Sequence, residues 1–354
     1  MLAQTIRGIF TSLTPENLNA VNALEASFNA QFQAEVKENV FDPSVAQGQA
    51  VANAILAWAA TDGFSSFSNC PYVPVAVPGA WVPTPPGFIT NPVQPCWGQI
   101  RPMVLNSAAD CPPPGHPAFS TGTGSEFYAA ALEVYNTNLT LTADQKTIAD
   151  FWADNAGATG TPPGHWIAIV GQLARNGVHH KRVGEEERHL RFRWLSLMAA
   201  AEAYARVGIA VTDAFIECWN AKYVYNLQRP VTYIQENIDA SWLPYLVTPN
   251  FPTYTSGHST QSGAAATVLT DMFGIVAFTD TIRTDHNLVP PLAPRTFDSF
   301  ATAAAEAAAS RLYTSLSTIT TGSLPASASA RRSSRACALR TTTMTTTTVR
   351  ISYK

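Results

Sequence analysis

The longest run of apolar residues at helical spacing is residues 197–223, LMAAAEAYARVGIAVTDAFIECWNAKY. Its apolar side chains recur every three or four positions, which is the period of an α-helix with a buried face. No part of the sequence shows the regular alternation of a convincing β-strand. We therefore expect an all-α fold, a helical bundle built around this helix.

Shorter helical patterns lie on both sides of that run, at 48–60, 126–138, 142–155, 165–175, 260–273 and 296–313. Thr142 precedes one of them and is a typical helix N-cap. Between about 61 and 122 the chain is rich in proline, glycine and aromatic residues, and no helix can run through that proline density. The sequence predicts one helical domain over 1–313, interrupted by this long Pro-rich loop.

The composition argues against several classes of protein. Hydrophobic residues make up 46% of the chain and charged residues 13%, which argues against wholesale disorder. A net charge of −3 gives no reason to expect nucleic-acid binding. No apolar run is long enough for a membrane span, and the N-terminus lacks the apolar segment of a signal peptide. So few charges on helical surfaces favour self-association, so a homo-oligomer is one expectation.

Two stretches differ from the rest. Residues 178–195, VHHKRVGEEERHLRFRWL, are abruptly charged and are interpreted as a solvated insertion. Residues 314–354 hold six of the basic side chains and none of the acidic ones, together with eleven threonines and eight serines. Such a composition does not support a packed element, so we expect this Ser/Thr/Arg tail to be disordered.

The strongest candidate site begins with two cations. Lys222 and Arg229 are two helical turns apart and would share one face of a helix, which Pro230 would then end or kink. Arginine suits bidentate contact with an oxyanion. Taken alone, these two residues would more often be ordinary surface residues at a helix end.

A second element completes an anion pocket. Ser256-Gly257-His258 precedes the helical pattern at 260–273, and the free backbone N–H groups of a helix start bind anions. Gly257 permits close approach, and His258 can give or take a proton near neutral pH. Together with the two cations these residues suit a tetrahedral, phosphate-like anion. A lone Ser-Gly-His tripeptide is a weak signal and is typical of a loop.

The motifs in order are more specific. KYVYNLQRP at 222–230, PTYTSGHST at 252–260 and Ser310-Arg311 resemble the signature K-x6-RP, PSGH and SR-x5-H of the vanadium-dependent haloperoxidase family, within the type 2 phosphatidic acid phosphatase superfamily. Thr255 stands where the signature has proline. The resemblance extends over roughly 47–313, including Pro95-Cys-Trp-Gly98.

The resemblance implies a helical bundle with an oxyanion site at its centre. Lys222, Arg229 and Arg311 would bind the equatorial oxygens of vanadate, or of phosphate in the same pocket. Ser256, the Gly257 N–H and Ser310 would complete that site, and His258 would be the general acid–base. The implied reaction is halide oxidation by hydrogen peroxide, with an organic acceptor. The alternatives are an acid phosphatase acting on phosphomonoesters, or a catalytically dead oxyanion-binding remnant. Members of the family are often periplasmic or secreted.

The sequence departs from the family at one decisive position. The third motif places a histidine at 317, the axial vanadium ligand or phosphatase nucleophile, but this chain has Ser317 and no histidine after His286. We hypothesise a shifted reading frame just after Tyr313, because in a neighbouring frame the codons for 316–319 can encode Leu-His-Tyr. The alternative is a divergent, non-catalytic paralogue. Relatives usually carry further N-terminal helices, so a truncated start is also expected.

The remaining candidates are weaker. Cys70, Cys96 and Cys111 share the Pro-rich segment, where either one disulfide or free thiols are consistent with the sequence. The histidines of the charged insertion show no metal-ligand spacing, and Asp285-His286 is interpreted as a polar pair in a loop. No zinc motif is present.

Overall fold

A computed structural model describes residues 1–67, 70–176 and 195–310 of the chain. The chain divides into two compact units, Met1–Ser68 and Asn69–Lys354. The helical domain predicted over 1–313 includes the boundary between them. The predicted tail lies outside the described residues, as does the predicted charged insertion apart from Leu195.

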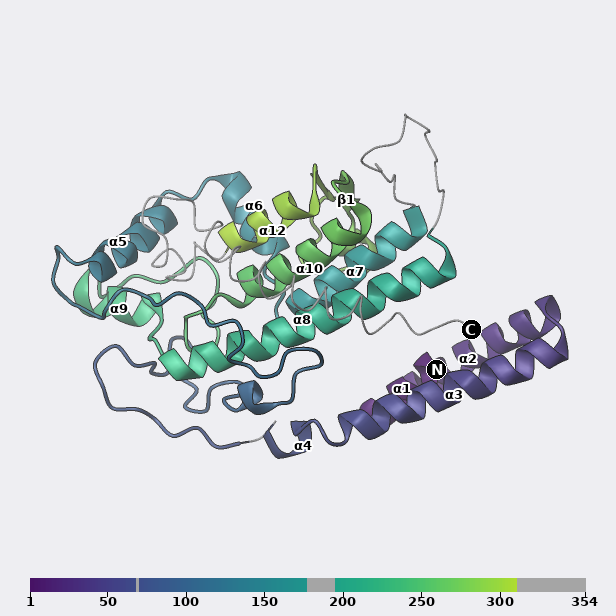
Figure 1. Cartoon of the computed structure of the whole chain (residues 1–354). Coiled ribbons are helices and arrows are strands. Elements are labelled where there is room, and N and C mark those ends of the chain that lie inside the picture. Colours follow the sequence, from purple (N-terminus) through teal and green to yellow (C-terminus); the bar gives the residue numbers. More distant parts are fainter. Residues whose placement is uncertain (68–69, 177–194, 311–354) are drawn as a thin grey trace. The chain divides into compact units, whose positions relative to one another are not determined.

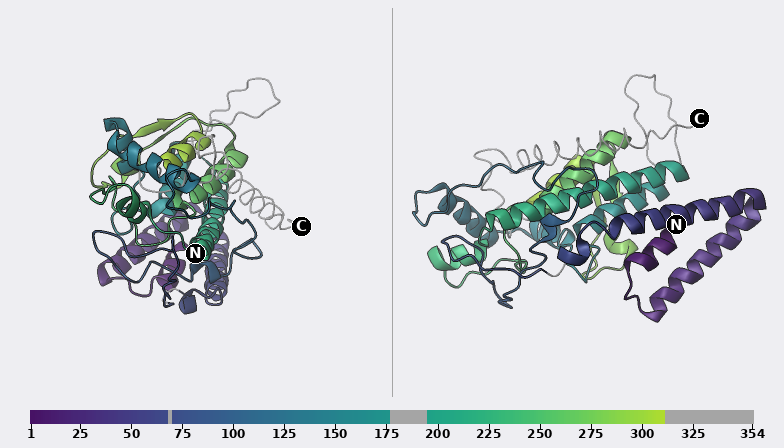
Figure 2. Two further views of the ribbon diagram at one scale, coloured as in Figure 1. Left: turned by 90° about the vertical axis from the view of Figure 1, so that its left-hand side faces the viewer. Right: turned by 60° about the horizontal axis from the view of Figure 1, so that its bottom comes forward.

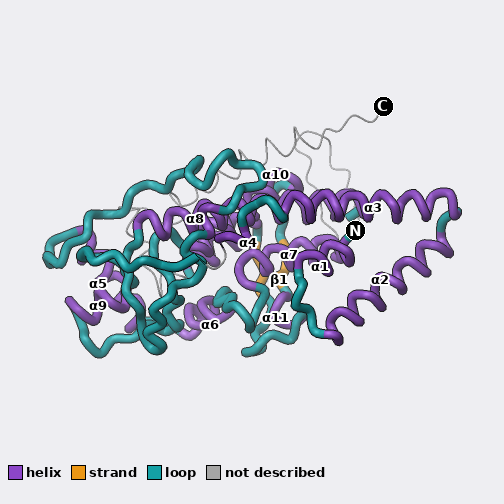
Figure 3. Tube along the Cα trace, turned by 90° about the horizontal axis from the view of Figure 1, so that it is seen from below, coloured by secondary structure: helices purple, strands orange, loops and turns teal. Residues whose placement is uncertain are grey.

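The first unit is helical throughout. It contains α1 (Leu2–Ile9), α2 (Pro15–Glu35), α3 (Glu38–Ala59) and the short α4 (Phe64–Phe67). Thr14 caps α2 by accepting a hydrogen bond from the Asn17 N–H, and a proline at the first helical position suits that start. Arg7 of α1 pairs with Glu25 of α2 at 2.8 Å. Figure 3 shows α2 leading into α3 and diverging from it as an open V, with α1 beside α3.

The second unit carries the rest of the secondary structure (Figure 1). Its elements are η1 (Trp97–Gln99), α5 (Glu126–Leu139), α6 (Ala143–Phe151), α7 (Thr161–Asn176), α8 (Leu197–Tyr225), α9 (Pro230–Asn237), α10 (Gly257–Phe273), β1 (Phe278–Asp280), α11 (Ile282–Asp285), β2 (Arg295–Phe297) and α12 (Phe300–Ala309). Thr142 caps α6 in a full capping box with Gln145, which confirms the predicted cap. None of the described helices is both long enough and apolar enough to cross a membrane.

The core of this unit forms around α10. This helix contacts α7, α8 and α12, and Figures 1 and 2 show the four side by side. Its middle is the small-residue run Gly263–Ala266, which is buried and lets neighbouring helices approach closely. On α8 the buried apolar residues recur at helical spacing, from Ala203 and Val207 to Ala214 and Cys218. The all-α prediction holds, because the structure is a helical bundle.

One small sheet was not expected. β1 and β2 pair antiparallel, with Phe278 opposite Phe297, and the two rings lie 5.5 Å apart. Each strand has three residues, which is too short for an alternating pattern to show in the sequence. The hairpin places Asp280 in the buried interior of the unit.

The Pro-rich segment is mostly irregular, as predicted, and is fastened to α8. Asp213 of α8 accepts hydrogen bonds from the N–H groups of three consecutive residues, 103–105, at 2.6–3.0 Å. A Cβ on Gly98 would lie 2.6 Å from the Asn220 Cα, so only glycine permits this approach. Cys70 and Cys96 form a disulfide, which settles the alternatives for that pair.

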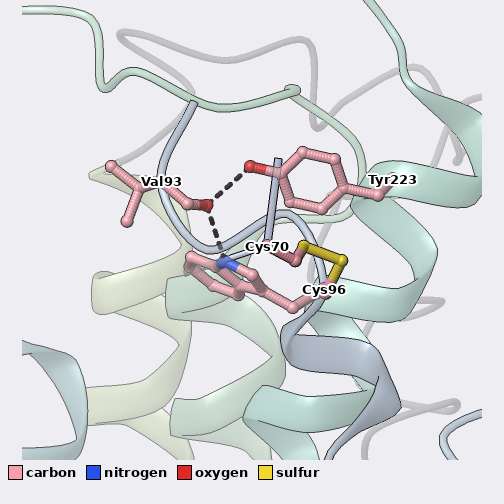
Figure 4. Close-up of a disulfide and its surroundings, with 5 residues drawn as sticks. Cys70, Val93, Cys96 and Tyr223 are labelled. Atoms are coloured by element: carbon pink, nitrogen blue, oxygen red, sulfur yellow. Dashed lines mark hydrogen bonds between the residues drawn. A yellow bond between two sulfur atoms is a disulfide. The ribbon is translucent and has the colours of Figure 1, made fainter. Parts of the chain in front are cut away.

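A second attachment of the same loop is shown in Figure 4. The Val93 carbonyl accepts hydrogen bonds from the Tyr223 hydroxyl at 2.6 Å and from the Trp219 indole at 3.3 Å. Both donors lie on the last turns of α8. The loop is therefore held against the end of the helix that carries Lys222.

Candidate functional site

A cavity of about 580 Å³ lies at the end of α8 in the second unit. Its walls come from α8, the start of α10, the loop after α6 and the Pro-rich loop. Five of the residues predicted from sequence line it together: Lys222, Arg229, Ser256, Gly257 and His258. Aromatic side chains form much of the remaining wall, including Trp97, Phe215, Trp219 and Phe251.

Lys222 lies in the last turn of α8 and is 1% exposed. Its Nζ donates hydrogen bonds to the carbonyls of Pro252 (3.0 Å), Thr253 (3.1 Å) and Thr255. The ammonium also lies 5.0 Å from the centre of the Phe251 ring. These contacts fix a buried positive charge at the cavity wall, since backbone carbonyls and a ring face compensate its lost hydration.

Arg229 reaches the cavity by a route that the sequence did not indicate. Asn226, in a left-handed conformation with φ 45°, ends α8, and Arg229 is the N-cap of α9. The prediction that Lys222 and Arg229 share one helical face is therefore wrong, and Pro230 begins α9 instead of ending α8. The Arg229 Nε donates to the Phe251 carbonyl at 2.5 Å, and its guanidinium lies 4.6 Å from that ring centre.

Helix α10 presents its N-terminus to the cavity. Ser256 is the N-cap, and its Oγ accepts hydrogen bonds from the Ser259 N–H (3.3 Å) and hydroxyl (2.9 Å). The helix begins at Gly257, earlier than the start near Thr260 predicted from sequence. Gly257 and His258 are thus its first two residues, and the first-turn N–H groups of a helix are the ones that bind anions. The positive end of the helix dipole adds to the two cations.

His258 faces a buried carboxylate. Its Nε2 lies 3.7 Å from Oδ2 of Asp154, which follows α6 in a left-handed conformation with φ 46°. Burial acts to raise the pKa of Asp154, but attraction to and hydrogen bonding by His165, with a smaller effect of His258, hold that pKa well below its ordinary value. Asp154 is therefore an anion at neutral pH beside the proposed acid–base.

Sequence patterns did not indicate Asp154 or the two residues connected to it, His165 and Asp280. The predicted helix 142–155 would have placed Asp154 in its last turn, whereas α6 ends at Phe151. Asp154 lies 3.0 Å from Nδ1 of His165, whose Nε2 lies 2.7 Å from Asp280. One signal was available, because His165 and Gln172 are polar residues within the otherwise apolar helix HWIAIVGQL.

Of the two residues predicted from the third motif, Ser310 and Arg311, the structure describes Ser310. Ser310 is fully buried at the end of α12, donates its hydroxyl to the Ala307 carbonyl at 2.8 Å, and does not line the cavity. Arg311 and Ser317 lie outside the described residues.

The described residues add no support for a site at Asp285-His286 or at the histidines of the charged insertion. The carboxylate of Asp285 pairs with Arg175 at 3.0 Å and with the Thr281 hydroxyl at 2.9 Å. The histidines of the insertion lie outside the described residues. Across 1–67, 70–176 and 195–310, no cluster of histidine, cysteine and acidic side chains has the arrangement of a metal site.

Comparisons with known proteins agree with this architecture. The family model of the VCPO second helical-bundle domain matches residues 202–323. The vanadium chloroperoxidase of Curvularia inaequalis is 32% identical over 130 residues, which span 32% of this chain and 20% of that protein.

Two solved structures extend the similarity over nearly the whole chain. A bacterial vanadium-dependent iodoperoxidase is 33% identical with a TM-score of 0.76, covering 94% of this chain and 75% of its own. A holo-type bacterial vanadium-dependent chloroperoxidase is 14% identical with a TM-score of 0.67, covering 98% and 82%, and shares the fold. The chain belongs to the vanadium-dependent haloperoxidase family.

Proposed function

We propose that the cavity at the end of α8 is a haloperoxidase-type oxyanion site that binds vanadate, or phosphate in the same place. The observation that carries the proposal is the convergence of Lys222, Arg229 and the first turn of α10 on one cavity of about 580 Å³. The donors are an ammonium, a guanidinium, a hydroxyl and backbone N–H groups. All of these stabilise a compact oxygen anion.

The residues present fit vanadate through its oxygens. Lys222 and Arg229 would bind its oxygens, and Ser256 and the Gly257 N–H would add hydrogen bonds. Arg311 would join them on the strength of its motif alone. Bound vanadate supplies the centre that activates hydrogen peroxide toward halide.

His258 would move the proton. Its ring lines the cavity and its Nε2 lies toward Asp154, which places an imidazole where it can exchange a proton with an oxygen of the bound anion. An anionic Asp154 near Nε2 favours a proton on that nitrogen. The aromatic wall formed by Trp97, Phe215 and Trp219 is suited to an apolar organic acceptor.

We further propose that turnover by this polypeptide is impaired. The third-motif histidine is replaced by Ser317, and a serine hydroxyl supplies neither a nitrogen ligand nor a comparable nucleophile at neutral pH. The same loss affects both peroxidase and phosphatase chemistry. Oxyanion binding does not depend on that residue alone, since the contacts above come from α8, α9 and α10.

Vanadate binding to the full chain tests the proposal. Vanadium NMR and equilibrium dialysis should detect saturable binding that phosphate displaces. Arg229→Ala should weaken it at least tenfold, since charge-assisted contacts are worth about 1.5–3 kcal/mol, and Lys222→Met should do the same. Arg175→Ala and Lys146→Met, at exposed positions outside the cavity, are the matched controls.

The outcomes separate the alternatives. Binding with weak but measurable bromide or iodide oxidation supports an impaired haloperoxidase site, and binding with neither halide oxidation nor phosphatase activity would select the catalytically dead remnant. Phosphatase activity that vanadate abolishes, without halide oxidation, would select the acid phosphatase alternative. Absence of saturable vanadate and phosphate binding would overturn the proposal, and robust bromination would overturn the impairment.

A further inference from the structure

His165 lies deeper in the second unit than the cavity and touches two carboxylates. It belongs to α7 and is fully buried. Its Nδ1 lies 3.0 and 3.1 Å from the two oxygens of Asp154, which lines the cavity. Its Nε2 lies 2.7 Å from Oδ2 of Asp280 in β1, which is also fully buried. The ring therefore links the cavity wall to the β-hairpin.

The hydrogen-bond partners determine the charge of this ring. Asp280 Oδ1 also accepts hydrogen bonds from Gln172 Nε2 (3.2 Å) and the Ile282 N–H (3.0 Å), while its Oδ2 faces the His165 ring. A neutral imidazole has one donor and would turn a lone pair toward the other carboxylate. An imidazolium donates from both nitrogens. Although burial acts to lower the pKa of His165, Asp154 and Asp280 raise it to about 10.

Its surroundings also favour a fixed cation. The Trp152 indole stacks on the His165 ring with 4.3 Å between centres and an angle of 17°. Stacking on an aromatic face stabilises a desolvated cation. Trp152 Nε1 donates in turn to Glu306 of α12 at 2.9 Å, which limits rotation of the indole.

Other charged groups bear on the same carboxylates. Arg283 of α11 interacts electrostatically with Asp154 and Asp280 and donates to the Asp150 carbonyl. On the cavity side, His258 faces Asp154, and Lys222 and Arg229 share that cavity. The Asp154 carboxylate thus contacts the His165 ring on its buried side and faces His258 on the cavity side.

We propose that His165 is a positioning residue, a buried imidazolium that holds the Asp154 carboxylate in the orientation that selects the Nε2–H tautomer of His258. Asp280 anchors the far side of the ring. His165 does not line the cavity, so it acts on a bound oxyanion only through Asp154 and His258. The inference rests on the proposed function for the role of His258 as acid–base, while the placement of the proton can be measured without any ligand.

Proton–nitrogen correlation NMR of the full chain, free of ligand, is the test. The spectrum should show both nitrogens of His165 protonated at neutral pH and a single Nε2–H tautomer for His258. His165→Gln retains one donor and no charge, so His258 should become a mixture of tautomers. His165→Lys restores a buried cation with several donors and should recover the single tautomer. His286→Gln, at an exposed position, is the matched control.

Two results would overturn the inference. One is a His258 tautomer that is unchanged in a folded His165→Gln protein. The other is equal disturbance by the Gln and Lys variants, which is the pattern of a purely structural ring. In addition, vanadate affinity should fall about ten- to a hundredfold in His165→Gln, the usual effect of losing a supporting partner. Failure of the wild-type protein to bind vanadate would count against the proposed function and leave the NMR result to decide on His165.

Discussion

The Nε2 of His258 lies 3.7 Å from the Oδ2 of Asp154, although His258 belongs to the first turn of α10 and Asp154 to the loop after α6. Asp154 is at the same time bound by His165, so one buried carboxylate serves two imidazoles. A change at Asp154 should consequently affect both the stability of the second unit and the state of His258.

Asp154→Asn should lower the free energy of unfolding by on the order of 3 kcal/mol, because removing one partner leaves a buried cation incompletely compensated. Urea unfolding followed by tryptophan fluorescence measures the change. Asp285→Asn removes a carboxylate that pairs with the exposed Arg175, and should cost less than about 1 kcal/mol. Equal effects of the two substitutions would contradict the account of Asp154.

The stability of the protein should depend on the titration of His165. Its folded pKa of about 10 lies above its ordinary value of 6.5, so its contribution is complete below about pH 6.5 and is lost as the pH rises toward about 10. Subtracting the pH profile of His165→Gln from that of the wild type isolates this contribution. A difference that stays constant from neutral to alkaline pH would show that His165 is not a buried cation.

Ionisation of Glu217 should lower the stability of the folded protein. Burial, with a smaller effect of Cys111, raises the pKa of this α8 carboxyl to about 8, so the folded protein resists its ionisation. Stability from the neutral form is therefore lost as the pH rises from about 4.5 toward about 8. Glu217→Gln should be more stable than the wild type above pH 8 and similar to it below pH 5.

Glu202→Gln provides the matched control for that experiment, because Glu202 lies on the same helix but is exposed beside Arg206. Its stability should follow the wild-type pH profile closely. If Glu217→Gln also follows the wild-type profile, Glu217 is ionised without cost and the interpretation fails.

The disulfide should stabilise the loop that borders the cavity. Cys70 and Cys96 are 26 residues apart, and closing a loop of that size is worth about 3 kcal/mol. A reductant should lower wild-type stability and leave Cys70→Ser/Cys96→Ser unchanged. Vanadate affinity, measured without reductant, should also be lower in Cys70→Ser/Cys96→Ser than in the wild type, since Val93 and Trp97 near the bridge line the cavity. Insensitivity of the wild type to reductant would exclude this role.

The coding DNA offers a separate prediction. Read past the α12 codons in all three frames, it should yield a histidine at position 317 after a single-base correction, followed by an ordinary helical C-terminus. DNA that agrees with the present translation would instead support a divergent, non-catalytic paralogue. If the correction restores the histidine, the protein expressed from the corrected frame should be assayed for bromide and iodide oxidation.

Motifs in the sequence identified much of the candidate site, but some of the reasoning behind them did not hold. Spacing suggested one helical face for Lys222 and Arg229, while a left-handed Asn226 places them on different helices. Both residues still line one cavity, because the motif depends on where the residues lie in the folded protein and not on a shared helix. The helical periodicity of the sequence predicted the bundle correctly, because apolar residues at helical spacing, as in α8 and α10, mark a buried helix face.

Contacts between residues far apart in the sequence could not be predicted from these local patterns. Asp154, His165 and Asp280 come from three separate elements, and no local period relates them. Helix 142–155 was predicted too long because ADNAG continues a plausible helical composition, and the left-handed Asp154 follows from its tertiary contacts. The three-residue strands were equally invisible, since their pairing depends on distant partners.

The most direct test of the central claim is a crystal structure of the full chain grown with orthovanadate. The account predicts tetrahedral or trigonal-bipyramidal oxyanion density within the cavity, in hydrogen-bond contact with the Gly257 N–H and beside Arg229 and His258. A cavity without the anion at saturating vanadate, or vanadate bound only elsewhere on the protein, would contradict it.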